Sequence, residues 1–107
     1  MSRDYLIVRR GDAVHVYLAG EIDLDEAPAV TRAIDRALTV QPERILINLD
    51  AVTFIDSAGL RALVNGYHDT VRAGAGFALG PAAPPVERVL ALTGLAVEPA
   101  VEPAVES

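Results

Sequence analysis

The chain has 107 residues, a formal net charge of −6 and no cysteine. This length is enough for one compact domain but not for two, and the lack of cysteine excludes disulfides, thiolate metal sites and a cysteine nucleophile. The acidic balance, with nine basic residues, all arginine, argues against nucleic acid as a direct partner, because neutralising phosphates needs a concentrated basic surface.

The first elements predicted are two strands, over residues 4–10 and 13–19, joined by a hairpin turn at Gly11-Asp12. Alternate residues of the second strand, starting from Val14, point to one face. His15 points to the other face, where a lone histidine is usually solvated or paired across strands, so we assign it no role.

A helix is predicted over residues 26–39, because apolar residues recur there at helical spacing from Val30 to Leu38. Pro28 is compatible with its first turn. Asp23 and Asp25 precede this helix, where carboxylates cap the helix start and complement its dipole.

The central stretch predicts a buried strand over residues 44–49, a short loop, and a second helix over residues 57–73 with Gly74 just after its end. The strand is a short apolar run rich in β-branched residues, as expected for a strand covered on both faces. Asp56 and Ser57 come just before the apolar series of the helix, which indicates a helix start at or beside Ser57.

The last part predicts a short strand over residues 76–79, a rigid loop over 80–85, a short helix over 85–93 ended by Gly94, and an edge strand over 95–97. After it, the four-residue unit Val-Glu-Pro-Ala occurs twice. Proline every fourth residue prevents a regular helix and removes strand donors. We therefore expect residues 98–107 to form a flexible acidic tail after a domain of residues 1–97.

This order of elements predicts an α/β fold, with a mixed, mostly parallel sheet. Strands joined by helices are parallel, so the N-terminal hairpin supplies the antiparallel pair. The hairpin is expected to form at least one edge of the sheet. We expect the helices to lie mainly on one side of the sheet.

Ser57 has two possible roles at this stage. Either Asp56 or Ser57 only caps the helix, or Ser57 accepts a phosphate. Unpaired backbone N–H groups and the positive end of the dipole would favour a phosphate at such a helix start.

Residues 52–60, with the sequence VTFIDSAGL, resemble the signature of STAS domains, and more narrowly that of the bacterial anti-sigma factor antagonists. The resemblance covers residues 4–97 by the order of motifs and implies the same α/β architecture. It also implies that Ser57 is the phosphorylated residue. Members of this family often continue with a clear last strand and another helix, whereas this chain has the proline-containing repeat, so the resemblance supports no partner surface built from the C-terminal segment.

The resemblance implies a partner that is both an anti-sigma factor and a serine kinase with a histidine-kinase-like ATPase fold. The unphosphorylated antagonist binds this protein and frees a sigma factor, and a metal-dependent serine/threonine phosphatase resets the cycle. ATP and magnesium belong to the kinase, so we expect no cofactor and no metal in this chain. The expected partner-binding residues are Asp23, Asp56, Ser57, Ala58, Gly59 and Arg61.

Two alternatives remain at this stage. The chain could be a STAS docking subunit of a transporter or a stress-signalling assembly, with no phosphorylation. A serine hydrolase is a remote alternative, because the Gly-x-Ser-x-Gly elbow has Ile55 where its first glycine belongs and neither His15 nor His68 is placed as a base. We therefore expect no enzyme. We also expect a cytoplasmic location without membrane insertion, because no apolar stretch approaches ~18 residues and no signal peptide is evident.

Overall fold

A hairpin begins the fold in the computed structural model, which describes residues 5–98. Strand β1 (Leu6–Arg10) pairs antiparallel with β2 (Ala13–Ile22). Gly11 adopts a left-handed conformation, with φ of 65°, in the tight turn between them. This conformation costs glycine little because it has no Cβ. The predicted hairpin is therefore confirmed.

The remaining strands are parallel to β2. Strand β3 (Arg44–Ile55) lies between β2 and β4 (Gly76–Ala82), and the order across the sheet is β1-β2-β3-β4. The hairpin strand β1 forms one edge. The mixed α/β sheet predicted from the sequence is thus confirmed.

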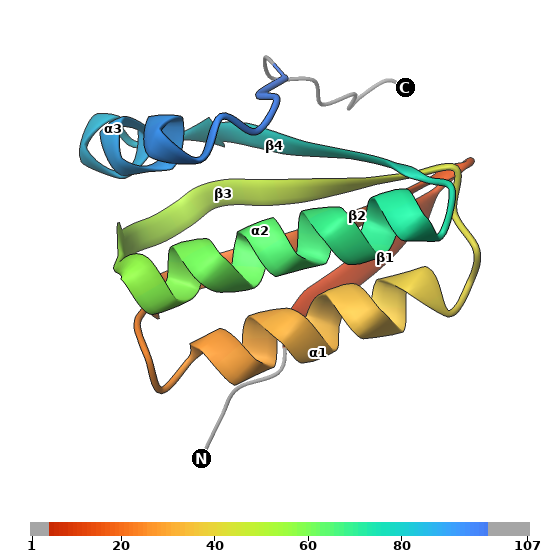
Figure 1. Cartoon of the computed structure of the whole chain (residues 1–107), viewed down its shortest axis with the longest axis horizontal. Helices are drawn as coiled ribbons and strands as arrows, with labels where there is room; N and C mark the ends of the chain where they lie inside the picture. Colours follow the sequence, from red (N-terminus) through yellow and green to blue (C-terminus); the bar gives the residue numbers. More distant parts are fainter. Residues whose placement is uncertain (1–4, 99–107) are drawn as a thin grey trace.

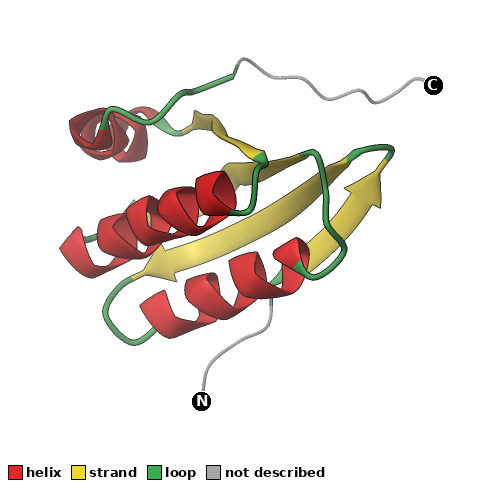
Figure 2. Cartoon of the chain, turned by 45° about the vertical axis from the view of Figure 1, so that its right-hand side comes forward, coloured by secondary structure: helices red, strands yellow, loops and turns green. Residues whose placement is uncertain are grey.

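Two long helices cover one face of this sheet (Figures 1 and 2). They are α1 (Ala27–Leu38) and α2 (Ser57–Arg72), while the short α3 (Pro84–Leu90) and a 3-10 turn, η1 (Ala91–Thr93), follow β4. No helix within residues 5–98 is long and apolar enough to cross a bilayer. The core between helices and sheet is built from fully buried aliphatic side chains, chiefly Val14, Val16, Leu18, Ile22, Val30, Ile34, Ile45, Ile47, Leu49, Val52, Leu63 and Leu79.

Gly66 explains how closely α1 and α2 approach each other. A Cβ on Gly66 would overlap the Cδ1 atom of Ile34, a buried residue of α1. The glycine inside α2, which costs ~1 kcal/mol relative to alanine in an exposed helix, therefore makes room for the packing of the two helices.

The predicted loop after residue 49 is wrong, because β3 continues to Ile55. Its last residues pair with an equally extended end of β2, with Phe54 opposite Glu21 and Ile55 opposite Ile22. Register shifts in this part of the ladder break the regular alternation of apolar and polar residues. The backbone pairing with β2, which the local sequence does not reveal, keeps this segment extended.

The predicted loop over residues 80–85 is also wrong. Strand β4 runs to Ala82, and α3 begins at Pro84. Proline is compatible with a first helical turn, because its missing N–H would have no intrahelical acceptor there. The 3-10 turn that follows ends at Gly94, as predicted, and this glycine is in a left-handed conformation.

The segment after Gly94 forms one isolated parallel bridge, between Leu79 and Val97, in place of the predicted edge strand. The Leu79 N–H donates to the carbonyl of Ala96 at 2.9 Å, and the Glu98 N–H donates to the carbonyl of Leu79 at 2.8 Å. The Glu98 carboxylate also pairs with the Arg44 guanidinium at 2.8 Å. Glu98, which we assigned to the tail, is thus attached to the sheet, and the rest of the predicted tail lies outside the described residues.

Candidate phosphorylation and partner-binding site

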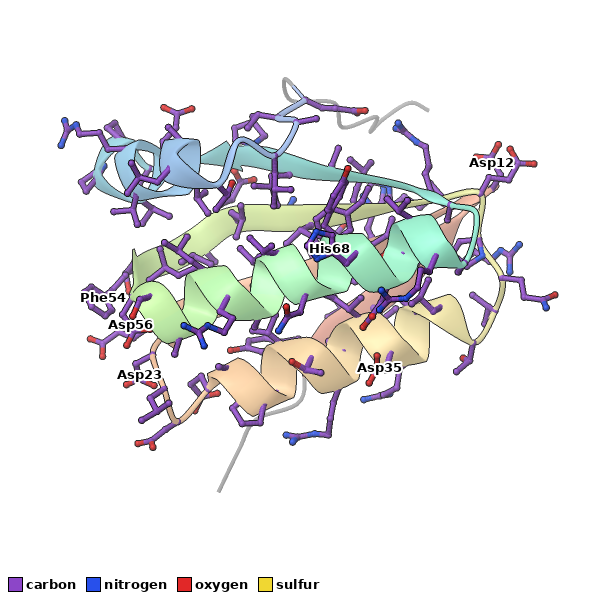
Figure 3. All side chains as sticks on the ribbon, viewed as in Figure 1. Asp12, Asp23, Asp35, Phe54, Asp56 and His68 are labelled. Atoms are coloured by element: carbon purple, nitrogen blue, oxygen red, sulfur yellow. The ribbon has the colours of Figure 1, made fainter. Side chains whose placement is uncertain are left out.

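The ends of β2 and β3 bring together residues that are more than thirty positions apart in the sequence. Ile22 and Ile55 pair at these ends, both buried, and the Asp56 N–H donates to the Ile22 carbonyl at 3.2 Å. The next residue after each strand is an aspartate, Asp23 or Asp56. Figure 3 shows both at one end of the domain, together with Phe54 and opposite the end that carries Asp12.

Asp56, and not Ser57, caps α2. Its carboxylate accepts hydrogen bonds from the N–H groups of Ala58 at 2.9 Å and Gly59 at 3.0 Å. Its backbone is extended, with φ of −109° and ψ of −172°, as N-cap residues require. The alternative that Ser57 serves as the cap is therefore excluded.

Ser57 is the first residue of α2, and its side chain is exposed. Within the part of the chain that the structure describes, its hydroxyl makes no hydrogen bond. This hydroxyl therefore has no structural task at the helix start and is accessible to another protein. One expectation needs correction, because two of the N–H groups that we expected to hold a phosphate already bind the Asp56 carboxylate.

Asp23 has a local structural role. Its carboxylate accepts hydrogen bonds from the backbone N–H groups of Asp25 at 3.1 Å and Glu26 at 3.2 Å, so it forms the turn that leads into α1. The expected capping of α1 by Asp23 or Asp25 is not borne out, because the N-cap of this helix is Glu26 and no side chain makes a capping hydrogen bond there. A contact between Asp23 and a partner stays a prediction.

Gly59 is buried and cannot belong to a contact surface. A Cβ at this position would lie 2.7 Å from the Ile22 carbonyl oxygen and 2.7 Å from Cγ1 of Ile55. The glycine thus allows the first turn of α2 to rest directly on the ends of β2 and β3. The expectation that Gly59 binds a partner is corrected on this ground, whereas its neighbour Ala58 is partly exposed.

Ser57 and Arg61 share a shallow groove between the N-terminal halves of α1 and α2. Arg61 is exposed and makes no hydrogen bond or ion pair with any residue in the range 5–98. The groove is open to solvent and is lined by Leu24, Ala27, Pro28, Thr31, Ser57, Ala58, Arg61, Ala62 and Asn65.

The polar residues farther along α2 do not belong to this groove. Arg72 pairs with Asp69 in the last turns of the helix, and His68 lies beside the ring of Tyr67 with 5.3 Å between centroids. His68 follows Ser57 by eleven positions, which is about 16 Å along a helix axis. His15 is buried, and strand alternation places it on the opposite face of β2 from Val14 and Val16, which belong to the core cluster shared with the helices.

Two exposed apolar residues at this end were not singled out from the sequence. Leu24 is 71% exposed, in the connection between β2 and α1, and Phe54 is 49% exposed near the end of β3. The signal for Leu24 was its place between two aspartates, where no core residue is expected. The position of Phe54 became clear only once β3 was seen to continue past residue 49.

A second hollow on this end is acidic. Its lining residues are Gly20, Glu21, Asp23, Asp25, Glu26 and Thr53. No group of three histidine, cysteine or acidic side chains within residues 5–98 is arranged to hold a metal ion. The acidic side chains therefore give this end a negative surface beside Ser57.

The chain is similar to known proteins in sequence and in fold. The STAS domain family matches the chain over residues 5–107. The anti-sigma F factor antagonist of Paenibacillus polymyxa is 33% identical over 81 residues, which are 75% of this chain and 69% of that protein. The chain belongs to the anti-sigma factor antagonists of the STAS domain family.

Solved structures agree with the assignment of this chain to the antagonist family. An anti-sigma factor antagonist from Mycobacterium paratuberculosis superimposes with a TM-score of 0.75 at 32% identity, over 84% of this chain and 76% of that one. The antagonist SpoIIAA in its unphosphorylated form superimposes with a TM-score of 0.78 at 20% identity, over 92% and 89% of the two chains. Its phosphorylated form gives 0.73 at 20% identity, over 92% of each chain. The likeness to SpoIIAA shows a common fold.

Proposed function

We propose that this antagonist is a binding protein switched by phosphorylation of Ser57. In its unphosphorylated form it binds an anti-sigma factor that is also a serine kinase, and this binding frees a sigma factor. The kinase phosphorylates Ser57, and the complex then dissociates. A serine/threonine phosphatase restores the unphosphorylated form, which binds the anti-sigma factor.

One observation carries the proposal: Ser57 is exposed at the start of α2, and its hydroxyl makes no hydrogen bond with any of residues 5–98, because Asp56 is the cap. A serine needed for capping would be shielded from a kinase and costly to modify. Ser57 can be modified without losing the cap.

The physical basis of the switch is charge at a closely packed surface. Phosphorylation adds about −1.5 to −2 charges at neutral pH. This charge would appear beside Asp56 and close to the acidic hollow around Asp23. A partner packed over Ser57 would have to desolvate the phosphate, and each loss of about 1.4 kcal/mol weakens the complex tenfold.

The fold is expected to survive this modification. Ser57 points outward, and the hydrogen bonds that attach α2 to the sheet end do not involve its hydroxyl. SpoIIAA, which shares the fold, has been determined in both an unphosphorylated and a phosphorylated form. We therefore place the effect of phosphorylation at the surface.

The test is to incubate the full chain with ATP, magnesium and each candidate serine kinase with a histidine-kinase-like ATPase fold from the same genome. Added phosphate is then mapped by mass spectrometry. We expect one phosphate, on Ser57, and none in the Ser57→Ala variant. Thr53 lines the neighbouring hollow and is a control position for nonspecific transfer. Absence of phosphate on Ser57 with every such kinase would overturn the proposal.

A second candidate function is constitutive docking without phosphorylation, as in a subunit of a transporter or stress-signalling assembly. The exposure of Leu24 and Phe54 favours it, because apolar side chains can bind a partner whatever the state of Ser57. The two functions differ in one measurement. A phosphate on Ser57 weakens binding in the first and leaves it unchanged in the second.

A further inference from the structure

We propose that Arg61 is the internal counter-ion of a phosphate on Ser57. This inference rests on the proposed function, because it concerns the phosphorylated form, and it names the residue that holds the phosphate against the domain. Ser57 and Arg61 line the same groove between α1 and α2.

The helix start itself offers the phosphate little. A helix N-terminus usually binds anions through its unpaired N–H groups. Here the N–H groups of Ala58 and Gly59 already donate to Asp56, and that of Leu60 donates to the Asp56 carbonyl at 2.9 Å. With these three N–H groups occupied, the phosphate depends mainly on side chains for its partners.

Charge directs the phosphate towards the groove. The Asp56 carboxylate lies immediately before Ser57 and is held in place by its two hydrogen bonds. Asp23, Asp25 and Glu26 surround the neighbouring hollow on the side of β2. Repulsion from these carboxylates disfavours that side, while the groove between the helices contains no acidic residue in its described lining.

Arg61 is the only charged residue among those that line the groove in the described part of the chain. It has no hydrogen bond or ion pair within residues 5–98, so no existing interaction must break before it turns to a phosphate. Its guanidinium can donate two parallel hydrogen bonds to phosphate oxygens.

The spacing on α2 suits this pair. Side chains four residues apart lie on one face of a helix, with Cβ atoms about 5–6 Å apart. An acidic group four residues before a basic one is the more favourable orientation, and a phosphate on Ser57 before Arg61 has that orientation. A phosphoserine and an arginine can bridge this distance without moving the backbone.

The pairing would give phosphorylation two effects on the partner-binding surface. It would add negative charge at Ser57, and it would remove the exposed cation of Arg61 from contact with a partner. A partner that recognises the neutral hydroxyl beside a free guanidinium would lose both features at once.

The test uses full-length protein with phosphoserine installed at position 57 during translation, so that it does not depend on a kinase. The pKa of the phosphate is measured by ³¹P NMR in the otherwise unchanged chain and in Arg61→Gln. A neighbouring cation favours the dianion, so Arg61→Gln is expected to raise the pKa of the phosphate, on the order of half a pH unit. The difference should shrink in high salt, since the pair is exposed.

Arg72→Gln is the matched control, because it removes the same charge from the last turn of the same helix, where Arg72 pairs with Asp69. It should leave the pKa of the phosphate unchanged. Equal values in Arg61→Gln and the unchanged chain would overturn the inference, provided that thermal unfolding shows both folded. Because the phosphate is installed directly, this result is independent of whether any kinase modifies Ser57, which is the test of the proposed function.

Discussion

The backbone N–H of Asp56 donates a 3.2 Å hydrogen bond to the carbonyl of Ile22. This bond connects the end of β3 to the end of β2, just before the two segments leave the sheet for α2 and α1. Ser57, the proposed phosphorylation site, and the acidic turn at Asp23 are therefore fixed relative to each other by the sheet.

Substitutions at Ser57 should separate folding from binding. Ser57→Asp places a negative charge at the same exposed position and should weaken binding to the anti-sigma factor at least tenfold, because a partner packed there must desolvate the charge. Its thermal midpoint should stay close to that of the wild type. Ser57→Ala should bind whether or not ATP is present. Isothermal titration calorimetry measures the binding of both variants, and loss of binding in Ser57→Ala would count against the switch.

Loss of the Asp56 carboxylate should destabilise the domain. Asp56→Ala removes the acceptor of two N–H groups at the start of α2, and capping aspartates of this kind contribute about 1 kcal/mol. Asp56→Asn should keep most of the stability, because asparagine also caps well. Asp25→Ala is the control, since its carboxylate accepts no hydrogen bond within the described range. Urea unfolding gives the free energies, and equal values for Asp56→Ala and Asp25→Ala would contradict the cap.

Gly59→Ala should be more harmful than an ordinary glycine substitution. The Cβ of an alanine at position 59 would overlap the backbone oxygen of Ile22. A backbone atom cannot move away by a rotamer change, as a side chain can. Overpacking of this kind costs about 1–3 kcal/mol, and the first turn of α2 would shift together with Ser57.

Gly76→Ala is the matched control for Gly59→Ala, because its Cβ would make an ordinary contact of 3.5 Å with Cβ of Arg44. Its free energy of unfolding should change by less than about 0.5 kcal/mol. Chemical denaturation compares the two variants. A Gly59→Ala protein as stable as Gly76→Ala would show that the close approach of α2 to the sheet end can relax freely.

Leu24 and Phe54 should contribute to binding and not to folding. Leu24→Ser and Phe54→Thr remove exposed apolar side chains at the end that carries Ser57, so stability should change by less than about 0.5 kcal/mol. Apolar anchors at the centre of an interface commonly contribute more than 1 kcal/mol, so binding to the anti-sigma factor should weaken about tenfold.

Leu92→Ser is the control for these two, because Leu92 is 81% exposed on η1, which follows α3. It should bind as the wild type does in the same calorimetric titration. If Leu24→Ser and Phe54→Thr also bound like the wild type, the interface would have to lie elsewhere on the domain.

The order and type of the main elements could be predicted because they depend on local patterns. The helical spacing from Val30 to Leu38 predicts a helix there, and Gly74 predicts the end of the second helix. Both predictions agree with the structure. The motif at residues 52–60 likewise indicates Ser57 as the candidate phosphorylation site from sequence alone. Periodicity, turn residues and helix-start residues are short-range features, so the sequence contains them directly.

Other properties were decided by contacts between distant segments. The extension of β3 to Ile55 depends on hydrogen bonding to β2, and the burial of Gly59 depends on the Ile22 carbonyl, thirty-seven positions earlier. Asp56, and not Ser57, caps α2 because the extended backbone of β3 continues through Asp56 up to the helix start. Sequence patterns indicated Ser57 and its neighbours as candidates, whereas the pairing of β2 with β3 determined which of them are exposed, because that pairing positions α2 against the sheet.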